Sequence, residues 1–344
     1  MSVFWGTKRA LFGPLGVWRY RDVLLSVLDD ASWTAFARRL SLGLLAETIA
    51  AREGIEPDRE SVRAAAEAHR RQERLLTVEE LEEWLGSQDL PVEEWHRYIV
   101  RGVLRSQLGP ALVGCEQDLS STGRFGDAFF AEALCSRFLP RARDAFTEKL
   151  VLAAEGGPLR VAPAPDAPDI LQRYPWLREV PEERLSHVRA VLVLAQTRLA
   201  LATTDLRVRG TIEQRRLDWT RLSCDVFLTS EQAIAREIAA CLRQEGEPFV
   251  RRAAHLPGLV HQARAFLLEE TPAPLRAAMV SACPAAIVGP WPEGERYAVY
   301  WVRERHAPRD DDPEIWARGV ACVQRSILKA AGARARAEDR ALRG

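Results

Sequence analysis

The chain has 344 residues, of which 47% are hydrophobic and 28% are charged, the balance of a globular protein long enough for two or three cooperating units. Lys+Arg and Asp+Glu both number 48, so the net charge of zero excludes an overall field that concentrates nucleic acid or an anionic membrane. The start lacks the charged tip and single apolar run of a secretory signal, and no window approaches the ~18 apolar residues of a membrane span, so we expect a cytoplasmic protein.

Residues 1–108 are predicted to form a helical lobe. Apolar residues recur at helical spacing over 21–49, in two helices of which Asp30 or Ser32 caps the second. Residues 77–80 read Thr-Val-Glu-Glu, the pattern of a capping box, in which the threonine side chain and the glutamate side chain each satisfy a free backbone amide. This pattern predicts the start of another helix.

Residues 109–212 are predicted to be a helical middle region. Pro140 is expected to kink or break its first half. The stretch 156–169, GGPLRVAPAPDAPD, is rich in Pro, Gly and Ala, which indicates a linker or an extended surface segment. Helical spacing resumes over 181–205.

Residues 213–307 change character and predict a module of strands and helices. We expect strands at 221–229, 286–291 and 296–304 and helices at 230–243 and 274–283. The stretch HLPGLVHQARAF carries His255 and His261, and neither is expected at a strand position that faces a site. Residues 308–344 predict a last helix with a charged tail that packs on the N-terminal lobe. The fold class is therefore α+β.

Sequence signals for cofactors and metals are missing. The chain has no Walker-type phosphate loop, no G-x-G-x-x-G turn and no G-x-S-x-G elbow, and no cysteines or histidines at zinc-ligand spacing. We expect no cofactor and no metal. Most of the six cysteines are expected to be small buried hydrophobes: Cys115, Cys135, Cys224, Cys241, Cys283 and Cys322.

Three segments of the module resemble one family. The segment from Ala235 through Gly246 to Phe249 is similar to the first helix of parvulin-type prolyl isomerases, which are related to PpiC. The run from Leu275 to Pro290 resembles the second signature of that family, and the Tyr297–Val302 stretch resembles its closing strand. The resemblance implies a parvulin-like α/β fold.

The flanks extend the resemblance to SurA-like proteins. The stretch 75–104 is similar to their N-terminal chaperone region, and 313–328 lies where their returning helix would be. This implies a helical N-terminal lobe joined by a helix that follows the isomerase module. Residues 109–206 match no family.

This chain differs from active parvulins at the positions of two histidines, and these differences determine the chemistry that we expect. Active parvulins carry a histidine on the first strand, where this chain has Cys224, Asp225 or Val226, and another on the last strand, where it has Ala298. The resemblance therefore implies no catalytic residue. A nucleophilic Cys224 is disfavoured because no histidine lies near it in sequence to act as a base.

The retained apolar and aromatic positions are candidates for peptide binding. Strand alternation lets only half of the strand aromatics face a groove, so core and groove roles both stay open for them. The candidates are Cys224, Phe227, Leu275, Met279, Trp291, Tyr297 and Tyr300 in the module and, on the SurA resemblance, Trp84 and Trp95.

The first functional hypothesis is a non-catalytic peptide-binding protein or chaperone. Degenerate parvulins of this kind resemble proteins of bacterial ribosomal-peptide maturation systems, for example those of crocagin-type pathways. This resemblance implies a precursor peptide and other biosynthetic enzymes as partners. We expect neither nucleic acid nor a membrane as partner. The alternatives are a divergent active prolyl isomerase and a structural scaffold in a multi-enzyme complex.

Overall fold

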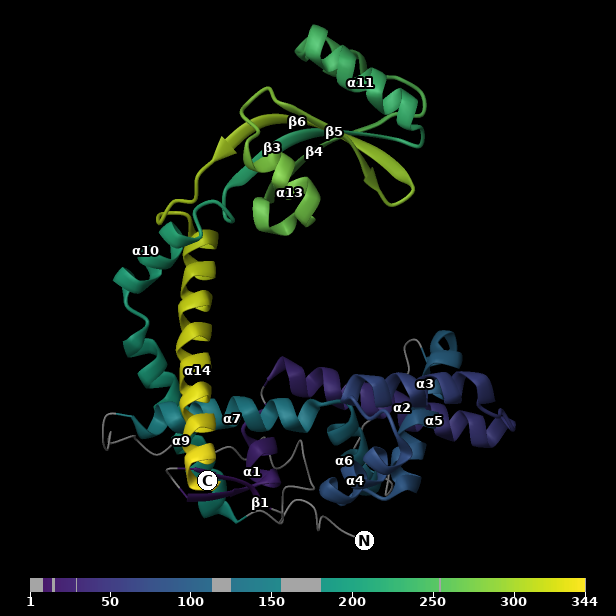
Figure 1. Cartoon of the computed structure of the whole chain (residues 1–344), viewed down its shortest axis with the longest axis vertical. Coiled ribbons are helices and arrows are strands. Elements are labelled where there is room, and N and C mark those ends of the chain that lie inside the picture. Colours follow the sequence, from purple (N-terminus) through teal and green to yellow (C-terminus); the bar gives the residue numbers. More distant parts are fainter. Residues whose placement is uncertain are drawn as a thin grey trace. The chain divides into compact units, whose positions relative to one another are not determined.

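The computed structural model describes residues 9–13, 16–28, 30–112, 125–155, 181–253 and 255–343. They belong to two compact units (Figure 1). Unit 1 comprises Met1–Leu199 and Leu328–Gly344, and unit 2 comprises Ala200–Ile327. The described elements are mostly helical and include a four-stranded antiparallel sheet, so the α+β class is confirmed. Residue Cys115 and the predicted linker 156–169 lie outside the described residues.

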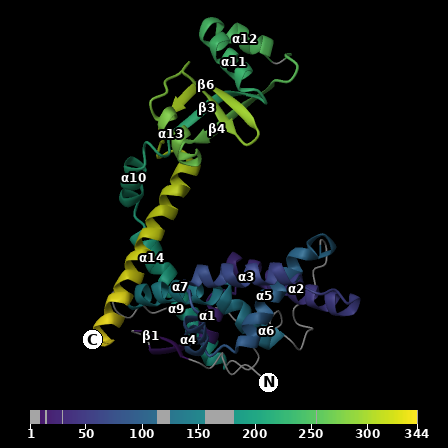
Figure 2. The same ribbon diagram turned by 45° about the vertical axis from the view of Figure 1, so that its right-hand side comes forward.

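Unit 1 is a helical assembly with one short hairpin (Figure 2). Its elements are β1 (Arg9–Gly13), β2 (Gly16–Arg19), α1 (Tyr20–Leu25), α2 (Ala31–Glu53), α3 (Arg59–Glu73), α4 (Val78–Gln88), α5 (Val92–Gln107), η2 (Gly109–Leu112), α6 (Phe125–Cys135), α7 (Phe138–Ala154) and α9 (Glu182–Ala202). The hairpin β1–β2 is antiparallel and was not predicted. The likeness of this unit to a SurA chaperone lobe stays a prediction.

Helix starts in unit 1 follow the capping residues. The Asp30 carboxylate accepts from the Ser32 amide at 3.0 Å, which selects Asp30 over Ser32 as the cap of α2. The Thr77 and Glu80 side chains form the predicted capping box of α4. The helical run breaks next to Pro140, as predicted: α6 ends at Cys135 and α7 begins at Phe138. Pro140 lies in the first turn of α7, where its missing amide hydrogen needs no partner.

A buried charge network sits among the helices of unit 1. The Arg101 and Glu132 side chains are 2% and 1% exposed and pair at 3.4 Å. The Arg39 guanidinium donates to the same carboxylate at 2.7 Å, and Glu47 accepts from Arg101 at 3.1 Å. A buried charge is tolerated only when it is paired, and here each has more than one partner. Gly43 provides the space, since a Cβ there would lie 2.6 Å from the Arg101 side chain.

Helix α9 is the one described helix whose length and composition are enough to cross a membrane. This finding departs from the expectation that no segment comes close. Its Val188, Val191 and Ala195 side chains are buried in the main hydrophobic core of unit 1. Of its apolar stretch 28% is buried, whereas the core helices that pass the same compositional test are mostly buried.

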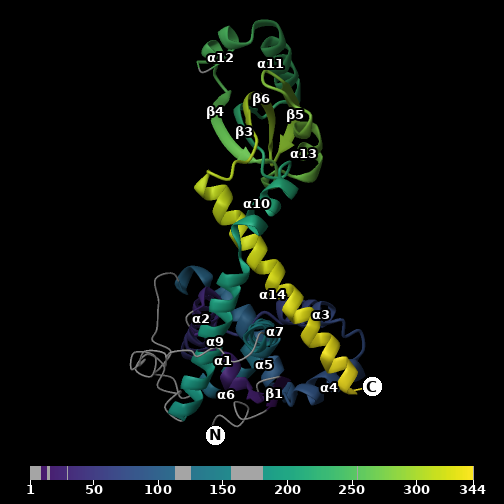
Figure 3. The ribbon, with the colours of Figure 1, turned by 90° about the vertical axis from the view of Figure 1, so that its left-hand side faces the viewer.

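Unit 2 contains the four-stranded sheet (Figure 3). Its elements are α10 (Asp205–Gln214), β3 (Arg221–Thr229), α11 (Gln232–Glu245), α12 (Glu247–Ala253), β4 (Val260–Leu267), η5 (Leu268–Glu270), α13 (Ala273–Val280), β5 (Ile287–Glu293), β6 (Arg296–His306) and the first part of α14 (Pro313–Arg343). Strand β4 was not predicted, and it carries His261. The predicted charged tail is helical to Arg343.

The sheet has the strand order β4-β3-β6-β5, and all neighbours are antiparallel. Helix α13 and helix α11 cover opposite faces (Figure 1). The register of β5 on β6 shifts between Val288 and Trp291. Gly289 lies in this irregular stretch at φ +125°, and a Cβ there would be 2.7 Å from the Ala298 carbonyl oxygen, so only glycine fits.

Candidate functional site

The α13 face of the sheet is a closed apolar layer. Alternate residues of β3 point to it, namely Leu222, Cys224, Val226 and Leu228, and they form one buried cluster with the α13 side chains. Leu275 and Met279 are 3% and 0% exposed. The cluster also contains Ala298, Tyr300 and Val302 of β6. Most predicted groove residues on this face are therefore core residues.

The strand geometry shows which face of the sheet holds each position where the parvulin resemblance implies a histidine. Cys224 and Val226 belong to the α13 face, as does Ala298, whereas Asp225 points to the other face. Val226 and Ala298 are both 0% exposed, and no histidine occurs among the described residues of this cluster. The face therefore has no imidazole that can hydrogen-bond to a bound peptide.

The two ionisable groups in this layer are held in their neutral forms. Burial, with a smaller contribution from the Asp225 carboxylate, raises the pKa of the Cys224 thiol to about 12. Burial also raises the pKa of Tyr300 to about 12, and its hydroxyl donates to Glu293 at 3.1 Å. A thiol with so high a pKa is a poor nucleophile, because the thiolate is the reactive form.

Polar side chains from both edge strands lie on the same face. Arg264 of β4 pairs with Cys224 in register, so the two side chains share a face. Its guanidinium forms an ion pair of 2.8 Å with Glu293 of β5, which also accepts from Tyr300. This bridge from one edge to the other spans the two central strands. It places a charged pair beside the apolar layer.

The opposite face holds an ionic cluster that sequence reasoning missed. His261 Nε2 lies 2.7 Å from Asp225 Oδ1, and its ring stacks on Phe227 with centroids 4.8 Å apart. The Arg303 guanidinium donates to both Asp225 and Glu247. Asp225 is 10% exposed, and a side chain so little exposed to water needs such partners. The signal available was the stretch VHQARAFL, which is long enough for a strand beside β3.

Of the remaining predicted peptide-binding residues, Trp291 alone joins the α13 face. Phe227 belongs to the core of the α11 face, and Tyr297 packs against it, whereas Trp291 packs on the α13 side. Trp84 and Trp95 belong to unit 1. The nine candidates therefore do not form one site.

Trp84 and Trp95 surround a buried histidine. His69 is 6% exposed, its Nδ1 accepts from Trp95 Nε1 at 3.3 Å, and its Nε2 lies 3.3 Å from the Cys135 carbonyl oxygen. Burial lowers the pKa of His69, which favours the neutral ring. Both tryptophans therefore have a structural role in packing around His69.

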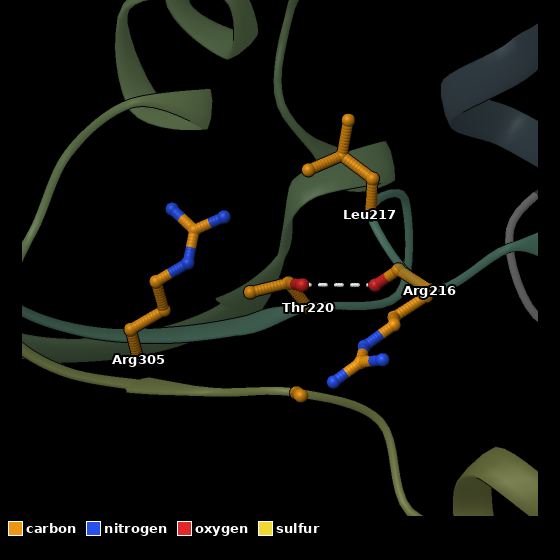
Figure 4. Close-up of a pocket in the computed structure, with 5 residues that line it drawn as sticks. Arg216, Leu217, Thr220 and Arg305 are labelled. Carbon is orange, nitrogen blue, oxygen red and sulfur yellow. Dashed lines mark hydrogen bonds between the residues drawn. The ribbon is translucent and has the colours of Figure 1, made fainter. Parts of the chain in front are cut away.

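A small cavity opens at the end of the sheet, between the α10–β3 connection and the end of β6. Its volume is about 400 Å³ and its lining is Arg216, Leu217, Thr220, Arg305 and Ala307 (Figure 4). The Thr220 hydroxyl donates to the Arg216 carbonyl at 2.9 Å. Arg305 Nη1 donates to three carbonyls at the end of α13, the shortest at 2.8 Å to Val280. Arg305 thus caps the C-terminal end of α13 by donating to its free carbonyls.

The outer edge of β4 has no partner strand among the described residues. Its side chains alternate in exposure, and Ala263 and Ala265 are exposed. Leu256 and Val260 at its start are 44% and 45% exposed. The other edge strand, β5, contains Pro290 and Pro292, which cannot donate backbone hydrogen bonds. The edge of β4 is therefore the better template for another strand.

No protein-family model matches the sequence, and no curated protein matches it. Among solved structures, the foldase protein PrsA from Streptococcus pneumoniae str. Canada MDR_19A is similar over 61% of this chain and 89% of that chain, with 12% sequence identity and a TM-score of 0.24. The similarity is with a foldase, and at this TM-score it carries no argument about fold or activity. No group of three metal-ligating side chains occurs within the described ranges.

Proposed function

We propose that the protein binds extended peptide segments and does not isomerise prolyl bonds. The observation that supports this most directly is the free edge of β4, whose backbone amides and carbonyls can pair with an added strand. Leu256 and Val260 offer exposed apolar surface at one end of this edge, which gives a bound peptide side-chain contacts as well as backbone contacts.

The side chains on the α13 face are the reason to propose that the protein does not isomerise prolyl bonds. Rotation about an X-Pro bond has a large barrier, and lowering it requires a shaped pocket that favours the twisted amide. In this protein the positions in question, Cys224, Val226 and Ala298, are filled with buried small or apolar side chains. These side chains argue against catalysis and leave binding as the proposed function.

The finer proposal concerns the ligand. The resemblance of residues 235–302 to degenerate parvulins of ribosomal-peptide maturation systems suggests a precursor peptide, which the protein would present to modifying enzymes. Titration calorimetry of the full chain with the small peptide encoded beside its gene tests this. Absence of binding at high micromolar concentration excludes the precursor peptide as ligand.

Proline substitutions test where the peptide binds. Successive amides of β4 alternate between β3 and the free edge, so one of Ala263→Pro and Arg264→Pro removes an outward donor and the other breaks the β3–β4 ladder. We expect the variant that keeps wild-type stability to lose peptide affinity about tenfold or more. Wild-type affinity in that variant would contradict edge binding. Thermal denaturation identifies which variant is which.

A divergent isomerase is the second candidate, and a proline-containing tetrapeptide assay separates it from the first. Turnover that Cys224→Ala or Asp225→Asn abolishes would overturn the binding-only proposal. A structural scaffold is the third. It predicts a stable complex with other proteins and no affinity for isolated peptides.

A further inference from the structure

Unit 1 contains a cavity of about 520 Å³ that is lined mainly by aliphatic side chains. Its walls come from α1, α7, α9 and the part of α14 that belongs to unit 1. The principal apolar contacts are Leu25, Leu152, Leu192, Leu199 and Leu328. The volume falls within the range of about 300–1,000 Å³ that is typical of small-molecule sites.

One cation lies in this apolar wall. Lys149 on α7 is half-buried, and its ammonium has no hydrogen bond or ion pair with any residue that the structure describes. The chain relies almost wholly on arginine for positive charge, since Lys8, Lys149 and Lys329 are its only lysines. A lysine in this position is therefore an exception to the composition of the chain.

The surroundings leave the Lys149 charge incompletely compensated. Burial lowers the pKa of Lys149, and the carboxylates of Asp30 and Glu148 oppose that shift. Asp30 also lines the cavity, but its carboxylate accepts from the Ser32 amide at the start of α2. A half-buried ammonium gains from an anionic partner that shields it from the low-polarity wall.

We propose that this cavity binds an aliphatic carboxylate, with the carboxylate against Lys149 and the hydrocarbon chain against the leucines. The charge complementarity sets the orientation of the ligand, and the aliphatic wall supplies the burial. Gln196 also lines the cavity, and its side chain can supply a neutral donor. This inference is independent of the proposed peptide binding.

Titration calorimetry of the full chain tests the proposal with decanoate, 1-decanol and decyltrimethylammonium. All three have the same chain length and differ in charge. We expect decanoate to bind about tenfold more tightly than 1-decanol, and the cation to bind least. Lys149→Met should reduce decanoate affinity to that of 1-decanol, and Lys149→Arg should restore part of it. Lys329→Met, which changes an exposed lysine, should leave it unchanged.

Amine labelling of the wild-type chain gives a readout that needs no variant. Reductive methylation followed by mass spectrometry reports Lys149 and Lys329 separately. Decanoate should protect Lys149 and leave Lys329 unprotected. Equal affinity for decanoate and 1-decanol, an unchanged affinity in Lys149→Met, or unprotected Lys149 at saturating decanoate would each overturn the proposal.

Discussion

The two faces of the four-stranded sheet in unit 2 differ in where they carry ionisable groups. On the α13 face, Cys224, Val226 and Ala298 are buried within an apolar cluster. On the α11 face, Asp225 connects His261 and Arg303. Strand β3 supplies both sets, because consecutive residues of a strand point to opposite faces. The imidazole of His261 therefore lies on the face away from α13.

The difference shows how one sheet can carry an apolar core on one face and ionisable groups on the other. A buried charge needs a partner within a few ångströms, and Asp225 has two cationic or potentially cationic neighbours. The α13 face satisfies its interior by apolar packing, with the Arg264–Glu293 pair, both partly exposed, beside it. One face is thus stabilised by apolar packing and the other by ion pairs. Exchanging side chains between the faces should therefore destabilise both.

The largest expected effect comes from placing a histidine on the α13 face. Ala298→His places a polar ring at a position that is 0% exposed and close to Gly289. Overpacking and an unsatisfied ring nitrogen should together lower the free energy of unfolding by about 3 kcal/mol or more. Chemical denaturation of the full chain measures this loss.

Ala265→His provides the matched control. Ala265 lies on β4 and is exposed, so the same substitution there should change stability by less than about 0.5 kcal/mol. Similar small losses at both positions would mean that the α13 face has an open slot beside Ala298, and the contrast between the two faces would fail.

Removing the anion of the α11 face should have a smaller but clear effect. Asp225→Ala leaves His261 and Arg303 without their common acceptor, while both side chains retain some access to water. We expect a loss of about 2 kcal/mol in the free energy of unfolding. Asp311→Ala is the control, because its ion pair with Arg309 is well exposed and should contribute little. A loss no larger than that of the control would remove the structural role of the cluster.

Local patterns predicted much of the fold. Strand β3 spans the predicted residues, and Asp30, Thr77 and Glu80 cap helices as their side-chain chemistry indicates. Strand β4 was missed because it follows a loop containing Pro257 and Gly258, and because its alanines and arginine dilute the apolar alternation. Its pairing with β3 is a long-range contact, which no local pattern reports.

The site was less accessible from the sequence than the fold. Asp225 was one of three alternatives for a histidine position, and only strand orientation separates it from Cys224 and Val226. The contact between Asp225 and His261 joins residues 36 positions apart. The charge of Lys149 was equally invisible, because its isolation depends on helices that meet only in the folded unit.

Cys224 gives the smallest expected effect on stability and the sharpest test of reactivity. Cys224→Val keeps the volume and the apolar character of the site, so it should change the free energy of unfolding by less than about 1 kcal/mol. The raised pKa of the thiol keeps the thiolate fraction low across pH 7–9, and burial limits access. Iodoacetamide labelling followed by mass spectrometry should therefore modify the exposed Cys283 long before Cys224. Labelling of Cys224 at the rate of Cys283 would show that the α13 face opens in solution and would reopen this face as a place where a peptide can bind.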